Sequence, residues 1–130
     1  MLQPQEVVVA KLLPTLRARV AQILLLDYSL RQTEVAKLLG LTQAAVSHYN
    51  TKSRGIDREI LRLFPEIEGH AQLLALRIRQ GLSKSQQIGA LNDICEHVLR
   101  TERFCNYHKT VADLDPGCQV CFPGVGKPVK

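Results

Sequence analysis

The 130-residue chain contains no tryptophan, one methionine, three phenylalanines and three tyrosines. Aromatic residues make up 5% of a sequence that is 45% hydrophobic, so we expect aliphatic side chains to fill the core. No apolar run is long enough to cross a bilayer. The start, MLQPQEVVVAKLLP, lacks the basic leader and small-residue cleavage site of a signal peptide. These absences predict a cytoplasmic protein that has no membrane partner.

Motifs of catalysis are also missing. The sequence has no glycine-rich phosphate loop, no Ser/His/Asp arrangement and no pair of carboxylates with a convincing shared pocket. Glu66 and Glu68 are typical of a helix N-terminus, and Asp113 and Asp115 of a solvated loop. We therefore predict that the chain is not an enzyme.

The chain is basic, with a formal net charge of +5 and a pI near 9.2. Residues 1–64 hold nine Lys or Arg and five Asp or Glu, whereas residues 65–130 hold eight and seven. Because the excess of positive charge lies in the N-terminal half, a polyanionic partner is expected there.

Residues 31–55, RQTEVAKLLGLTQAAVSHYNTKSRG, predict two short helices joined by a tight turn. Val35 and Ala36 give the first helix apolar residues at helical spacing, and Val46 does so in the second. Gly40 stands where the turn needs a positive φ, which glycine adopts at little cost. Thr42 can cap the second helix. This pattern is typical of a helix-turn-helix motif that binds DNA.

The order Gln32, Ala36, Gly40, Thr42, Gln43, Val46 resembles the phage-repressor (Cro/C1, or XRE) class of helix-turn-helix proteins. The segment LTQAAVS, residues 41–47, resembles one that recurs in archaeal regulators with such a domain near the N-terminus and cysteines near the C-terminus. The resemblance covers most of the chain, and its specific part is confined to the helix-turn-helix. It implies a transcription regulator that binds double-stranded DNA.

The same resemblance implies that helix 42–49 lies in the major groove. There the Gln43 amide can bond the paired donor and acceptor of adenine, and Ala44 can contact a thymine methyl. Cations and polar groups on either side would hold backbone phosphates. The candidate DNA-binding residues are Arg31, Gln32, Thr42, Gln43, Ala44, Ser47, His48, Lys52, Ser53 and Arg54.

Helical spacing predicts further helices on both sides of this motif. One is expected to run from Pro14, in its first turn, to about Asp27, while residues 4–11 fit either a helix turn or a strand. Asp57 is expected to cap a short helix that Pro65 interrupts. The fold class is therefore all-α, with a phage-repressor-like helix-turn-helix domain over residues 1–64.

Two amphipathic helices follow over residues 65–103, the first ending at Gly81 and the second capped by Ser83. They need a partner surface, and we expect packing against a second copy in a homodimer, because repressors of this class usually bind paired half-sites. From Phe104 onward the helical pattern breaks into segments with Pro and Gly, so residues 104–130 are expected to form a cysteine-containing segment and tail.

The four cysteines, Cys95, Cys105, Cys118 and Cys121, are separated by nine, twelve and two residues. Four thiolates can hold a [4Fe–4S] cluster or a tetrahedral zinc ion, and both stay open. His108 is a substitute ligand at most, and His70 and His97 have no ligand-spaced partner. Cys95 also fits the apolar stripe of its helix, where it would act as a small hydrophobic residue.

A cluster that pins the dimer helices would make DNA binding respond to redox state or iron. The prediction is thus a dimeric DNA-binding regulator with a four-cysteine iron–sulfur cluster. One alternative is the same regulator with a structural zinc site. Another, from a different class, is a small redox or electron-transfer protein that uses the helices as scaffold.

Overall fold

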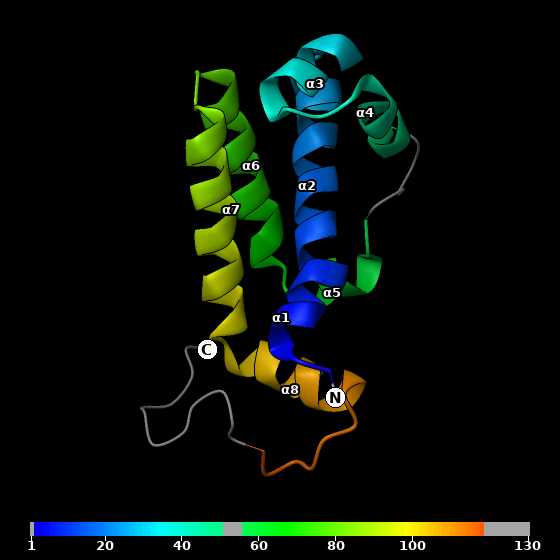
Figure 1. Cartoon of the computed structure of the whole chain (residues 1–130), viewed down its shortest axis with the longest axis vertical. Helices are drawn as coiled ribbons and strands as arrows, with labels where there is room; N and C mark the ends of the chain where they lie inside the picture. Colours follow the sequence, from blue (N-terminus) through cyan, green and yellow to red (C-terminus); the bar gives the residue numbers. More distant parts are fainter. Residues whose placement is uncertain (1, 51–55, 119–130) are drawn as a thin grey trace.

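The computed structural model describes residues 2–50 and 56–118, and the regular structure in these ranges is helical, which confirms the all-α prediction (Figure 1). The elements in chain order are α1 Pro4–Val7, π-helix η1 Val8–Leu12, α2 Leu13–Gln22, π-helix η2 Ile23–Asp27, α3 Gln32–Leu39, α4 Gln43–Asn50, α5 Arg58–Leu63, α6 Glu66–Arg79, α7 Lys84–Leu99 and α8 Glu102–Val111. None of the described helices is long and apolar enough to cross a membrane.

The first four elements follow one another without a break and form one long helix from Pro4 to Asp27. The prediction that this helix starts at Pro14 was wrong, and the open question about residues 4–11 is answered as helix. Pro14 cannot donate a helical hydrogen bond, but it follows a π-helical turn, and the Thr15 hydroxyl donates to the Lys11 carbonyl at 2.8 Å. Burial of Val7 and Leu12 holds the N-terminal part in place.

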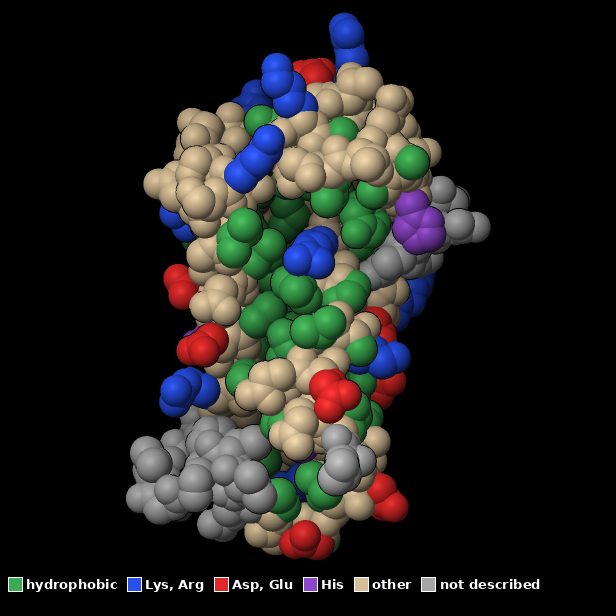
Figure 2. All heavy atoms as spheres, viewed as in Figure 1, with side chains coloured by type: hydrophobic (Ala, Val, Ile, Leu, Met, Phe, Trp, Pro, Cys, Tyr) green, Lys and Arg blue, Asp and Glu red, His purple; other side chains and the backbone are tan. Residues whose placement is uncertain are grey.

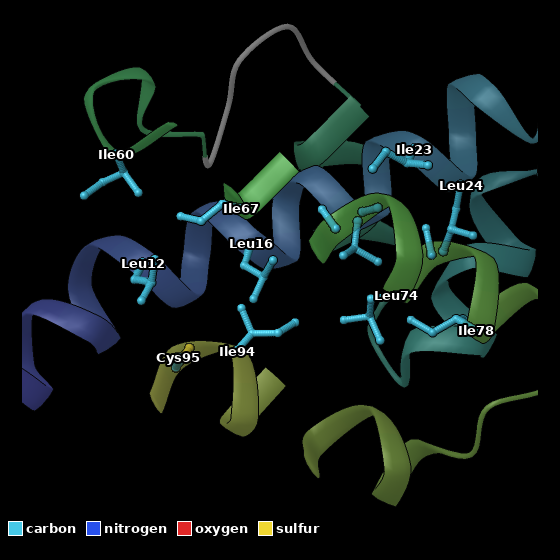
Figure 3. Close-up of a cluster of buried hydrophobic side chains, with 14 of the residues drawn as sticks. Leu12, Leu16, Ile23, Leu24, Ile60, Ile67, Leu74, Ile78, Ile94 and Cys95 are labelled. Carbon is cyan, nitrogen blue, oxygen red and sulfur yellow. The ribbon is translucent and has the colours of Figure 1, made fainter. Parts of the chain in front are cut away.

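The α2 segment lies in the middle of the molecule, with α6 and α7 alongside it (Figure 1). Figure 3 shows aliphatic side chains of the long N-terminal helix, such as Leu12 and Leu16, facing Ile67 of α6 and Ile94 of α7. The expected aliphatic core is confirmed. Its largest aromatic members, Phe64 and Phe104, have ring centroids 6.0 Å apart.

Local capping signals are confirmed at three helix ends. The Asp57 carboxylate accepts the N–H groups of Glu59 and Ile60 at the start of α5. Gly81, at a φ of 109°, ends α6. Ser83 opens α7 with a capping box, its hydroxyl accepting the N–H of Gln86.

One polar contact joins α2 to α6. The Arg19 guanidinium donates to both carboxylate oxygens of Glu68, at 2.6 and 3.0 Å. This arginine is the main cause that lowers the pKa of Glu68, and partial burial opposes the effect. The pair therefore favours the ionised carboxylate in the folded chain.

The prediction that the helical pattern breaks from Phe104 onward was wrong, because residues 102–111 form α8. The Thr101 hydroxyl accepts the N–H of Phe104 at 3.2 Å and caps this helix. Phe104 and His108 face inward and are buried, and His108 Nε2 lies 2.8 Å from the Leu2 carbonyl oxygen. The helix forms because its inner face packs on the core, across the end of the molecule opposite α3 (Figure 1).

Candidate nucleic-acid interface

Two short helices, α3 and α4, are joined by a tight turn, as the sequence predicts, and pack against each other. Gly40 has a φ of 67°, and the N–H groups of Gly40 and Leu41 both donate to the Ala36 carbonyl. The Thr42 hydroxyl then accepts the N–H of Ala45 at 3.1 Å, which caps α4. The left-handed conformation of Gly40 and the cap by Thr42 together set the angle between α3 and α4.

The α4 helix is anchored from beneath. Val46 is fully buried and Tyr49 half-buried. The Gln22 side chain of α2 donates to the Tyr49 carbonyl at 3.1 Å. Because these contacts use one face and the last turn, the opposite face of α4 is left to solvent.

The outward face of α4 carries most of the predicted base-contacting residues. Thr42, Gln43, Ala44, Ser47 and His48 are all exposed. The Gln43 amide makes no hydrogen bond to any described residue, so both its donor and its acceptor are open to a ligand. Only the His48 ring has an aromatic neighbour, an edge contact with Tyr49 at 6.0 Å.

Arg31 and Gln32 lie at the start of α3. The Arg31 side chain is 86% exposed and meets the Glu34 carboxylate only at 4.0 Å, too loosely to bind it firmly. Gln32 is half-buried, so less of its amide is open than that of Gln43. Lys52, Ser53 and Arg54, predicted to hold phosphates, lie outside the described residues.

A cation that the sequence did not single out joins this end of the molecule. Lys84, the first residue of α7, runs past the turn, and a Cβ on Gly40 would lie 3.3 Å from its Cδ and Cε. Lys37 is also exposed on α3. In Figure 2 Lys and Arg side chains gather at the end of the molecule formed by α3, while most of the visible Asp and Glu lie further down. Lys84 is far from the motif in sequence, so no local pattern could have indicated its place.

The α7 helix also braces the end of α3. The Gln87 amide nitrogen donates to the Leu38 carbonyl at 2.8 Å and to the Leu82 carbonyl at 3.2 Å. Gln87 is only 7% exposed, so both bonds are sheltered from water. The position of the α3–α4 pair thus depends on α7.

The predicted metal ligands are spread over different elements. Cys95 is 7% exposed on the inner side of α7, Cys105 lies on α8, and Cys118 follows that helix. Among the described residues no group of three His, Cys, Asp or Glu side chains could hold a metal ion. Cys121 lies outside the described residues, so the four-cysteine site stays a prediction.

Cys95 behaves as the hydrophobic residue that its place on the stripe suggests. Burial raises the pKa of its thiol to about 11, and the Arg17 guanidinium only partly opposes that rise. A thiolate, the form that binds metal, is therefore disfavoured at neutral pH. As they lie, the described cysteines do not fit a cluster or a zinc ion. The His108 ring already contacts the Leu2 carbonyl oxygen through Nε2.

The described surface thus offers one anchored helix with an open amide and small side chains, beside several exposed cations. Such a surface can bond base edges in a groove and phosphates beside it. Comparisons of this chain with protein-family models, with curated proteins and with solved structures found no match.

Proposed function

We propose that the chain is a sequence-specific DNA-binding transcription regulator of the phage-repressor helix-turn-helix type. The observation that carries the proposal is the exposed face of α4, with Gln43, Ala44 and Ser47 outward and Val46 fixed in the core. An α-helix is about 10–12 Å across with its side chains, which matches the major groove of B-DNA at about 12 Å.

Each exposed group has a defined task in this proposal. The Gln43 amide bonds the N6 and N7 edge of an adenine, and Ala44 packs on a neighbouring thymine methyl. Arg31 and Lys84 contact backbone phosphates, which sets orientation without reading sequence. Paired half-sites would then be read by a homodimer.

The experiment is a binding titration by fluorescence anisotropy on a duplex selected from random sequence and on a scrambled duplex. Gln43→Ala should weaken the selected duplex by about 1–3 kcal/mol and leave the scrambled one nearly unchanged. Arg31→Ala should weaken both and reduce the salt slope by about one.

Matched controls come from the opposite end of the molecule. Asn106→Ala removes an exposed amide of α8, and Arg100→Ala an exposed cation at the end of α7. Both should bind like the wild type. Equal losses of affinity for the two duplexes in Gln43→Ala would contradict the proposed base contact. Failure to select any duplex would contradict the proposed function.

A cysteine-ligated cofactor is a separate proposal, and DNA recognition does not depend on it. The residues that would hold a [4Fe–4S] cluster, or zinc in its place, are Cys95, Cys105, Cys118 and Cys121. Since the described cysteines do not converge, no step of DNA binding is derived through such a group.

A further inference from the structure

An apolar groove runs between the N-terminal helix and α7. Its volume is about 370 Å³, and its apolar lining comes from Val8, Val9, Leu13, Ile88, Leu91 and Leu99. Figure 2 shows hydrophobic side chains along this hollow between α2 and α7. Val9 is 64% exposed and Ile88 69%, although side chains of this kind are stabilised by burial. Among the residues that the structure describes, none covers this groove.

The groove also holds two opposite charges that do not meet. Arg17 of α2 and Glu96 of α7 both line it, yet no ion pair joins them to each other or to another described residue. The Arg17 guanidinium is near enough to the Cys95 thiol to affect its ionisation. A partner surface that presents apolar side chains, an anion to Arg17 and a cation to Glu96 would therefore match this groove.

The hollow continues toward the candidate interface. Arg17 and Leu91 also line a smaller cavity of about 60 Å³, which reaches Leu39 at the end of α3 and Leu41 in the turn before α4. Whatever fills the groove thus lies next to the element that positions α4.

We propose that a second copy of this chain covers the groove in a two-fold dimer, in which Arg17 pairs with Glu96 of the partner subunit. A two-fold interface needs a surface that carries both members of every contact, and this groove does: an apolar seam on α7, one cation and one anion. The seam has helical spacing, with Ile88, Leu91 and Leu99 on the same side of α7.

A dimer interface would extend beyond the groove itself. A standard interface covers about 800 Å² of each protein, and the chain exposes 8026 Å². An interface of that size would take about a tenth of this surface and would include the exposed Val9 and Ile88 side chains together with the rest of the groove. An apolar anion is disfavoured, because Glu96 would face it.

The groove would then be the contact surface of the homodimer in the proposed function, and only the consequence for DNA binding rests on that function. The α7 helix carries Ile88 to the partner and, one residue earlier, Gln87 to the Leu38 carbonyl. The dimer would therefore fix the separation of the two α4 helices, which determines the half-site spacing that can be bound.

The test is sedimentation equilibrium of the full chain over a wide range of concentrations, without DNA. The wild type should show twice the monomer mass of 14.5 kDa. Ile88→Glu should raise the dimer dissociation constant about a hundredfold, because a charge replaces a buried isoleucine twice in each dimer. Its circular dichroism should match the wild type, since this side chain is exposed in the single chain.

Leu73→Glu is the matched control, because Leu73 is 56% exposed on α6 and does not line the groove. It should change the dissociation constant by less than about threefold. Arg17→Glu and Glu96→Arg should each weaken the dimer about tenfold, and both together in one chain should restore it, since the exchanged charges again face each other.

A wild type that stays monomeric at every concentration overturns the proposal, whether a small molecule or another part of the chain fills the groove. A dimer that survives Ile88→Glu overturns it too. If the double charge reversal does not restore the affinity of the dimer, the proposed pairing of Arg17 with Glu96 is contradicted. Because DNA is absent, a dimeric chain that fails to bind any duplex would contradict the proposed function and leave this interface standing.

Discussion

Replacing Gln87 by methionine tests whether α7 holds the α3–α4 pair in place. Methionine keeps the length and apolar contacts of the side chain but removes both hydrogen-bond donors. The two acceptors that lose a partner are the carbonyl groups of Leu38 and Leu82. Leu38 lies in the last turn of α3, where a carbonyl has no intrahelical donor.

The magnitude follows from these two bonds. A neutral hydrogen bond contributes about 1 kcal/mol net, and a buried carbonyl left without a donor costs about 1–3 kcal/mol. Both bonds are sheltered, so we expect Gln87→Met to lower the free energy of unfolding by about 2 kcal/mol. The local stability of α3 should fall most, because the Leu38 carbonyl that loses its donor belongs to this helix.

Urea unfolding followed by circular dichroism measures this loss, at one protein concentration because the stability of a dimer depends on concentration. Amide hydrogen exchange should rise in α3 and α4 more than in α6. Gln80→Met is the matched control, since Gln80 is exposed and should change stability by less than about 0.5 kcal/mol. A loss for Gln87→Met no larger than that of the control, with unchanged exchange in α3, would refute the reasoning.

Two further predictions concern acid stability and the cofactor. Because Arg19 lowers the pKa of Glu68 below its ordinary value of 4.5, the pair stabilises the fold above that pH and loses this contribution as the pH falls through the lower folded value. Glu68→Gln should therefore lower the free energy of unfolding by about 0.5–1 kcal/mol at neutral pH, a small figure because the pair is partly exposed. In urea unfolding at lower pH, the difference in stability from the wild type should disappear. A difference that stays constant from neutral pH to acid would contradict the role given to this pair. For the cofactor, anaerobically purified protein should contain iron and acid-labile sulfide if the four cysteines hold a cluster, and stoichiometric zinc in a colourless protein if they hold a structural ion. Protein that contains neither metal would end the four-cysteine proposal.

Helix ends were predictable because the signals that make them are local. An Asp or Ser at an N-cap satisfies N–H groups two or three residues later, so Asp57 and Ser83 indicated their helices without knowledge of the fold. Gly40 and Gly81 adopt positive φ angles that other residues avoid. The candidate recognition surface was predictable for the same reason, since Thr42, Gln43 and Val46 belong to one short stretch.

The two errors in the fold arose where packing outweighs a local signal. Pro14 marks a helix start in isolation, yet the chain continues helical on its N-terminal side because Val7 and Leu12 are buried there. Residues 102–111 are polar on average, and α8 forms because Phe104 and His108, four residues apart on one face, pack inward. Spacing cannot tell which distant residues these side chains pack against.

The sequence by itself determined that the chain is helical, where most of its helices end and which side chains face outward on α4, because caps, turns and helical spacing act over a few residues. Only the tertiary structure decided which distant residues meet. It placed Gln87 at the end of α3, Lys84 beside Gly40, and Arg17 with Glu96 in one apolar groove. It also separated the described cysteines, which cluster in sequence, among different elements. These contacts between distant residues depend on how whole helices pack. Helix packing is set by the shape of the complete core rather than by any short segment.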